Sequence, residues 1–173
     1  MHSKKNKIGI LGGSFDPPHK GHLAISKEAL KRFKLKKVIW AITQKNPFKK
    51  KSRFSLLSRI KSCKKLLCNN NSIEVKFYEN IIKSNKTINL IKYLSKNKKN
   101  EIFFLMGADN LINFHKWYKS EMIAQKCKII VFDRHGYKKK SLDSSSFKRL
   151  NNKSLKFIEF NKVNISSSQL RKI

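Results

Sequence analysis

The sequence is poor in the residues that cross-link small secreted proteins or build metal centres. It contains three cysteines, Cys63, Cys68 and Cys127, an odd number without a Cys-x-x-Cys pair. This spacing indicates neither a disulfide framework nor a zinc site, and free thiols are typical of the reducing cytosol. We therefore expect a cytoplasmic protein without a metal site of its own.

Long apolar segments are also missing. The charged residues 1–7 precede an apolar run of only four residues, 8–11, which ends at two glycines. A signal peptide requires an apolar region of about 7–15 residues, and a membrane helix about 20. We expect neither feature, and hence no membrane partner. The length of 173 residues predicts one domain, 1–173, with a single core.

Acidic residues and arginine are scarce. Ten Asp and Glu oppose 41 Lys and Arg, which gives a formal net charge of +31, but only six of the basic residues are arginine. Such a charge attracts polyanions, yet nucleic-acid surfaces usually rely on arginine for bidentate and stacked contacts. Lys, Asn and Ile, which share A/T-rich codons, make up 70 residues. We interpret the charge as a solvated surface set by composition and expect no nucleic-acid partner; a basic RNA-binding module is the alternative from a different class.

Short apolar runs alternate with amphipathic segments along the whole chain. This pattern predicts an α/β fold, a Rossmann-like doubly wound parallel sheet flanked by helices. The residues 138–153, rich in Lys, Asn and Ser, are predicted to form the most flexible loop. Strands are expected at 8–11, 38–42, 73–77, 102–106, 129–132 and 157–160, and helices at 21–34, 53–68, 87–96 and 117–126.

The most informative motif lies between the first predicted strand and the first predicted helix. Residues 12–22 read Gly-Gly-Ser-Phe-Asp-Pro-Pro-His-Lys-Gly-His. Gly12 and Gly13 allow a tight turn and the close approach of a ligand, and the two prolines stiffen the loop. The N-terminus of the following helix favours an anion. His19 and His22 either cap this helix or donate hydrogen bonds to a phosphate, and the motif is neither a Walker A loop nor a dinucleotide fingerprint.

Other candidate residues follow later strands, where α/β sheets bind their ligands. Lys49 lies in a basic loop that is either plain surface or a phosphate contact. Gly107 lets a flat ring pack on the backbone, and Asp109 can accept a hydrogen bond from a hydroxyl or amine. Trp117 is either a core residue or a stacking face for an aromatic ligand. Residues 164–171 indicate a serine-capped helix start with an arginine, either a second anion site or a simple cap.

Together these segments resemble the nucleotidyltransferases of the His-x-x-His superfamily, and more narrowly the bacterial nicotinate-nucleotide adenylyltransferases of NAD biosynthesis. The superfamily is suggested by residues 12–22 and by Ile-Ser-Ser-Ser-Gln-Leu-Arg at 165–171. The narrower resemblance rests on residues 104–111, 114–117 and 133–137. These matches follow the order of the family over nearly the whole chain.

The resemblance implies that the 5′-phosphate of nicotinate mononucleotide attacks the α-phosphorus of ATP, with Mg2+ on the phosphates, to give deamido-NAD+ and pyrophosphate. It implies catalytic roles for His19, His22 and Arg171. It also implies that ATP contacts Gly12, Gly13, Ser14, Phe15, His19, His22, Gly107, Asp109, Ser167 and Arg171, the first residues through their backbone. The resemblance further implies that nicotinate mononucleotide contacts Lys49, Thr87, Trp117, Tyr118 and Arg134.

Two points stay open at this level. Another enzyme of the superfamily, a phosphopantetheine adenylyltransferase or a cytidylyltransferase, is the alternative activity, and a homo-oligomer is compatible with the sequence. The chain also departs from the family pattern: His135 stands where relatives usually have a proline, and a further difference lies at the start of the third predicted helix. Relatives usually have Tyr-Thr-x-x-Thr-Leu at the start of the third predicted helix, whereas this chain has Lys86-Thr87-Ile88-Asn89-Leu90-Ile91.

Overall fold

The computed structural model describes residues 5–45 and 51–159. Six parallel strands form one sheet in the order β3-β2-β1-β4-β5-β6, which confirms the predicted fold class. Each predicted strand is present, and the last begins at Leu155, earlier than expected. The strands are β1 (Asn6–Gly13), β2 (Lys37–Ile42), β3 (Ile73–Lys76), β4 (Asn100–Gly107), β5 (Lys128–Phe132) and β6 (Leu155–Ile158).

The four predicted helices are present, although the last begins at Ser120 and not at residue 117, and several short helices accompany them. Within the described residues, none of the helices has the length and apolar character needed to cross a membrane. The helices are α1 (Lys20–Phe33), α2 (Leu56–Leu67), α3 (Glu79–Ile82), α4 (Thr87–Ser95), α5 (Ala108–Leu111), the 3-10 helix η1 (Phe114–Lys116), α6 (Ser120–Lys126), α7 (Lys138–Leu142) and α8 (Ser145–Leu150).

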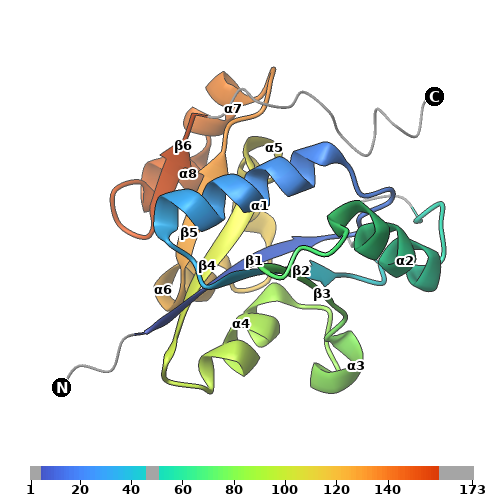
Figure 1. The fold of residues 1–173 in the computed structure, drawn as a ribbon. Coiled ribbons are helices and arrows are strands. Elements are labelled where there is room, and N and C mark those ends of the chain that lie inside the picture. Colours follow the sequence, from blue (N-terminus) through green and yellow to red (C-terminus); the bar gives the residue numbers. More distant parts are fainter. Residues whose placement is uncertain (1–4, 46–50, 160–173) are drawn as a thin grey trace.

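The four central strands, β1, β2, β4 and β5, bury both of their faces, because alternate apolar side chains point to opposite sides of the sheet. Ile10 and Phe104 belong to one core, which α4 and α6 cover. Leu11 and Leu105 belong to the other, which α1 and α2 cover. Figure 1 shows α1 and α4 on opposite sides of the sheet. This two-sided covering is why the strands read as continuous apolar runs in the sequence.

The segment 138–153 is not the flexible loop that its composition predicts. It contains the short helices α7 and α8. Ser144 caps α8 by accepting the N–H of Phe147 at 3.2 Å, and the Phe147 ring packs edge-on against Phe157 of β6. A serine cap, together with Phe147 and Leu150 packed against the core, therefore helps to order a segment that is otherwise rich in solvated residues.

The chain reverses its direction of strand addition between β1 and β4. Ile10 of β1 is paired with Ile39 on one side and with Phe104 on the other. Successive strands are added toward β3 on the first side and toward β6 on the second. In doubly wound sheets the loops diverge at this point and leave a crevice at the carboxyl ends of the strands. The crevice is thus expected beyond Gly13 and Gly107.

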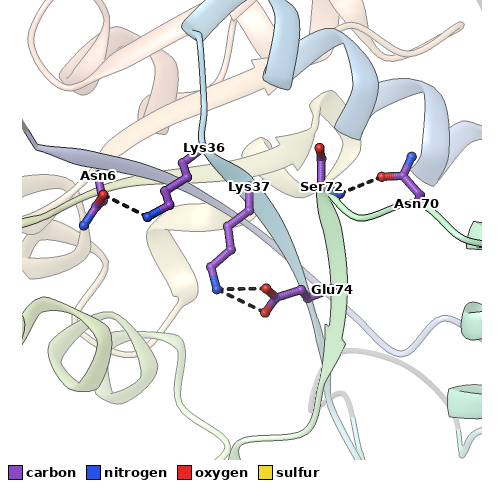
Figure 2. A network of polar contacts seen from close by, with 6 residues as sticks. All are labelled: Asn6, Lys36, Lys37, Asn70, Ser72 and Glu74. Carbon is purple, nitrogen blue, oxygen red and sulfur yellow. Dashed lines mark hydrogen bonds and ion pairs between the residues drawn. The ribbon is translucent and has the colours of Figure 1, made fainter.

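The opposite, amino-terminal edge of the sheet is held by polar contacts (Figure 2). Lys37 Nζ donates to both carboxylate oxygens of Glu74, at 2.9 and 3.1 Å, and so ties β2 to β3. Lys36 donates to the Asn6 side chain at 3.3 Å. Because both partners of the Lys37–Glu74 pair are about one-third exposed, the pair contributes at most about 1 kcal/mol. This edge has a supporting role only.

Candidate active site

His19 and His22 use one ring nitrogen each to cap α1. His19 Nδ1 accepts the N–H of Gly21 at 3.1 Å, and His22 Nδ1 accepts the N–H of His19 at 3.2 Å. The two ring centroids are 3.8 Å apart. Because Nδ1 is the acceptor, the proton of each neutral ring is on Nε2, which is then a hydrogen-bond donor. The two interpretations of these residues are therefore compatible: capping through Nδ1 sets the donor at Nε2.

His22 is held from two directions. Its ring packs against Phe15, with 4.7 Å between centroids, and Phe15 stacks on Trp40 at 5.0 Å. Trp40 Nε1 donates to Ser26 Oγ at 2.8 Å, and Ser26 Oγ donates to the His22 carbonyl at 2.8 Å. These contacts restrict both the ring and the backbone of His22. Such restriction is what a donor needs in order to meet a phosphate without reorganising.

The tight turn in this motif is made by Phe15, not by the glycines. Gly12 and Gly13 are the last two residues of β1, whereas Phe15 has a left-handed φ of 48°. The interpretation of the glycines as the turn is therefore wrong, although both do line the cavity described below, with no side chain in the way. The Phe15 side chain is buried in the core, so only its backbone can face a ligand.

Arg59 is a functional candidate that the sequence did not reveal. It lies on α2, is 2% exposed, and donates to main-chain carbonyls of the loops after β1 and β2. Its Nη1 reaches Ser14 at 2.6 Å and Thr43 at 2.9 Å, while Nη2 reaches Gln44 at 3.1 Å. Nε donates to Phe54 at 3.2 Å. A buried cation therefore fastens the loop that precedes the two histidines.

The signal that could have revealed Arg59 is its residue type. Arginine is rare in this lysine-rich chain, and Arg59 is one helical turn from Leu56 on the apolar face of α2. A planar guanidinium carries five N–H donors in a fixed fork, so one buried side chain can donate to several carbonyls at once. Asp16, also buried, adds a second fastening, because its carboxylate accepts the N–H groups of Arg53 and Phe54 at 2.7 and 3.1 Å.

A cavity of about 350 Å³ opens beside the loop between β1 and α1, at the carboxyl ends of β1 and β2. Trp117 contributes to it and packs edge-on against Phe104, with centroids 6.0 Å apart, and against Phe114 at 5.3 Å. Trp117 thus belongs partly to the core and partly to the cavity. The lining residues are Gly12, Gly13, Ala41, Ile42, Thr43, Tyr78, Glu79, Ile82, Ser84, Asn85, Lys86, Thr87, Leu90, Phe104, Lys116, Trp117, Tyr118 and Ile123.

Asp109 lies at the carboxyl end of β4 with one oxygen paired and one not. Oδ2 accepts Arg134 Nη1 at 2.6 Å, whereas Oδ1 is buried and has no hydrogen-bond partner among the residues that the structure describes. A buried carboxylate oxygen without a donor is costly unless a ligand supplies one. Gly107 makes room for it, because a Cβ at residue 107 would be 2.6 Å from Oδ1.

The structure places the described residues among those predicted for the site in three groups. Gly12, Gly13, Thr87, Trp117 and Tyr118 line the cavity. Ser14, Phe15, His19 and His22 form the adjoining β1–α1 loop and helix start, and Gly107, Asp109 and Arg134 cluster beyond β4. Arg134 is thus beside a predicted ATP contact and is not in the lining with the other predicted mononucleotide contacts. Lys49, Ser167 and Arg171 lie outside the described residues.

Buried thiol and phenol groups near these elements are held in their protonated forms. Burial raises the pKa of Cys63 and of Cys127 to about 12, and the described cysteines are free thiols. Burial, with the nearby Glu74 carboxylate, also raises the pKa of Tyr78. Tyr78 therefore presents a neutral hydroxyl where it lines the cavity. In the described part of the chain, no three His, Cys, Asp or Glu side chains group as metal ligands would.

Comparisons with known proteins agree with this geometry. The model of the cytidylyltransferase-like family matches residues 10–173. A probable nicotinate-nucleotide adenylyltransferase of Pelagibacter ubique (strain HTCC1062) is 62% identical over 173 residues, which cover 100% of this chain and 96% of the relative. A protein of the same name from Bradyrhizobium sp. (strain ORS 278) is 40% identical over 129 residues, covering 74% of this chain and 67% of the relative.

A solved structure shares the fold at low sequence identity. The Plasmodium falciparum nicotinic acid mononucleotide adenylyltransferase complexed with NaAD superposes with a TM-score of 0.80 at 22% identity, covering 96% of this chain and 83% of that one. The histidine pair, the cavity beside the strand-order reversal and the near full-length relative agree with one another. The chain therefore belongs to the cytidylyltransferase-like family and, within it, to the nicotinate-nucleotide adenylyltransferases.

Proposed function

We propose that this protein joins nicotinate mononucleotide to the AMP moiety of ATP, forming deamido-NAD+ and pyrophosphate in the cytoplasm. One observation carries the proposal: a fixed pair of histidine donors adjoins an aromatic cavity at the carboxyl end of β1, beside the point where the strand order reverses. The first element suits phosphates and the second suits a pyridine ring. A homo-oligomer remains a prediction, to be checked by the mass of the protein in solution.

The reaction is an in-line displacement at the α-phosphorus of ATP. A 5′-phosphate oxygen of the mononucleotide forms the new P–O bond, and the bond to the β-phosphate breaks with its electron pair leaving on pyrophosphate. No covalent enzyme intermediate is needed, so catalysis consists of positioning and charge stabilisation. His19 and His22 donate through Nε2 to the phosphate oxygens where negative charge develops.

The remaining residues bind and orient the substrates. Gly12 and Gly13 let the nucleotide approach the end of β1, and Asp109 Oδ1 accepts a hydrogen bond from an adenosine hydroxyl or amine, with Arg134 holding the carboxylate. Trp117 stacks on the pyridine ring. Further contacts to the substrates are proposed for Ser14, Phe15, Gly107, Thr87, Tyr118, Lys49, Ser167 and Arg171. Mg2+ enters with ATP, bound to its phosphates, as part of the substrate.

The direct test is an assay with Mg-ATP and nicotinate mononucleotide that follows pyrophosphate release. We expect deamido-NAD+ to form in equal amount to pyrophosphate, because each turnover releases one of each. Parallel reactions with nicotinamide mononucleotide, with phosphopantetheine and with CTP in place of ATP test the other activities of the superfamily. Binding of single-stranded RNA that persists with saturating ATP, together with silent catalysis, would contradict the proposal.

Gly107→Ala tests the role of Asp109 in this reaction. The new methyl group would meet Asp109 Oδ1, and the side chain can move aside without unfolding the protein. We expect about tenfold lower kcat/KM for ATP, the cost of one weakened hydrogen bond to a charged group, with little change in Tm. Steady-state kinetics provide the measurement.

The control is a double-mutant cycle with Asp109→Ala. If Gly107→Ala acts through the carboxylate, it has little further effect when that carboxylate is absent. Independent, additive losses in the double variant would mean that the methyl group disturbs the site by another route.

A further inference from the structure

The cavity carries more positive than negative charge. Lys86 and Lys116 line it, and Glu79 is the acidic residue in the lining. The Glu79 carboxylate is already engaged, since it accepts hydrogen bonds from the Thr43 hydroxyl and from the N–H of Gln44 at the end of β2. The Glu79 carboxylate therefore points toward Thr43 and Gln44, just after β2. The balance of the cavity favours an anionic ligand.

Lys86 is placed where it can act on the ring-binding part of the cavity. It immediately precedes α4 and is next to Thr87, which also lines the cavity. Lys86 Nζ is 6.0 Å from the centroid of the Tyr118 ring, and Lys119 Nζ is 5.2 Å from the same centroid. Two ammonium groups thus share one aromatic ring at the cavity.

We propose that Lys86 is a specificity-determining residue that favours nicotinate mononucleotide over nicotinamide mononucleotide. This inference rests on the proposed function. The two substrates differ in a carboxylate and a neutral amide on the pyridine ring, so a cation beside the ring attracts only the first. Because Lys86 is exposed, solvent weakens the attraction, and a change of about tenfold in selectivity is expected.

The test compares kcat/KM for the two mononucleotides in three variants. Lys86→Gln should lower the acid-to-amide ratio of kcat/KM about tenfold, and Lys86→Glu should lower it further. Lys86→Arg should retain the wild-type ratio, because it alone keeps the cation. Lys92→Gln is the matched control, since Lys92 is an exposed lysine on α4, the helix that Lys86 precedes, and is not part of the lining. The wild-type ratio should also fall as salt rises, because screening weakens an exposed charge pair.

Loss of rate that is equal for the two substrates, or a ratio that does not respond to Lys86→Glu, would overturn the inference. Calorimetric binding of each mononucleotide without ATP separates this outcome from a failure of the proposed function. Binding that prefers the acid and loses this preference in Lys86→Gln supports the inference even if no product forms, whereas product formation with an unchanged preference supports the function and refutes the role of Lys86.

Discussion

Replacing His22 by asparagine should lower kcat by about 10²–10³-fold, the loss typical of removing one preorganised donor from a transition state. His22 Nδ1 accepts the N–H of His19, and the Oδ1 atom of an asparagine can replace it as the acceptor of that cap. The asparagine has no atom equivalent to Nε2. The substitution therefore removes the donor to phosphate while keeping the helix start.

The measurement pairs steady-state kinetics with a thermal melt. Tm should fall less in His22→Asn, which keeps an acceptor for the cap, than in His22→Ala, which loses it; both variants lose the ring contacts with Phe15 and Trp40. Lys27→Gln, at an exposed position on the same helix, is the control and should behave as wild type. If His22→Asn retained kcat within about threefold, the donor role of Nε2 in this mechanism would be excluded.

Replacing Arg59 by methionine should reduce the free energy of unfolding by about 3–5 kcal/mol. The buried carbonyl of Ser14 loses a charged donor, as do the less buried carbonyls of Thr43, Gln44 and Phe54, and a buried group left unsatisfied costs roughly 1–3 kcal/mol before relaxation. Arg59→Lys should cost less, about 2 kcal/mol, because an ammonium group can donate to only some of these carbonyls.

Urea denaturation measures the effect, and the corresponding decrease in Tm should be roughly 10 °C or more. Arg149→Met provides the matched control, because Arg149 forms an ion pair with Glu121 in which both side chains are more than 60% exposed. That control should cost at most about 1 kcal/mol. Equal stability losses in the two variants would show that Arg59 does not hold the loops as described.

The sequence predicted the strands and the covered sheet better than the short helices. Apolar runs such as 102–106 marked buried parallel strands, since both faces of β4 are covered. Short helices were missed because α3 and α5, with four residues each, are too brief to show a helical period. In 138–153 the lysines and serines hid a serine cap and the core contacts of Phe147 and Leu150 that help to order the segment.

In the candidate site, residues within one short motif were predicted, whereas contacts between segments distant in sequence were not. His19 and His22 were found because a short motif contains both the helix start and the donors. Arg59 was missed because its partners Ser14 and Gln44 come from loops that are distant in sequence, and its position near the apolar face of α2 is the only local sign of a buried cation. The capping role of Nδ1 likewise needed coordinates, since a sequence does not distinguish the two ring nitrogens.

The central place of β1 in the sheet also determines when an active site can exist. Asn6 at the start of β1 is paired with Asn100 of β4, so the crevice between these strands requires contacts between residues far apart in sequence. Such pairings are formed slowly, because a long loop must close before they form. During synthesis, the first half of the chain already carries the histidine pair but has no neighbour to complete the crevice. The complete active site therefore forms only after β4 has been synthesised and has paired with β1 in the sheet.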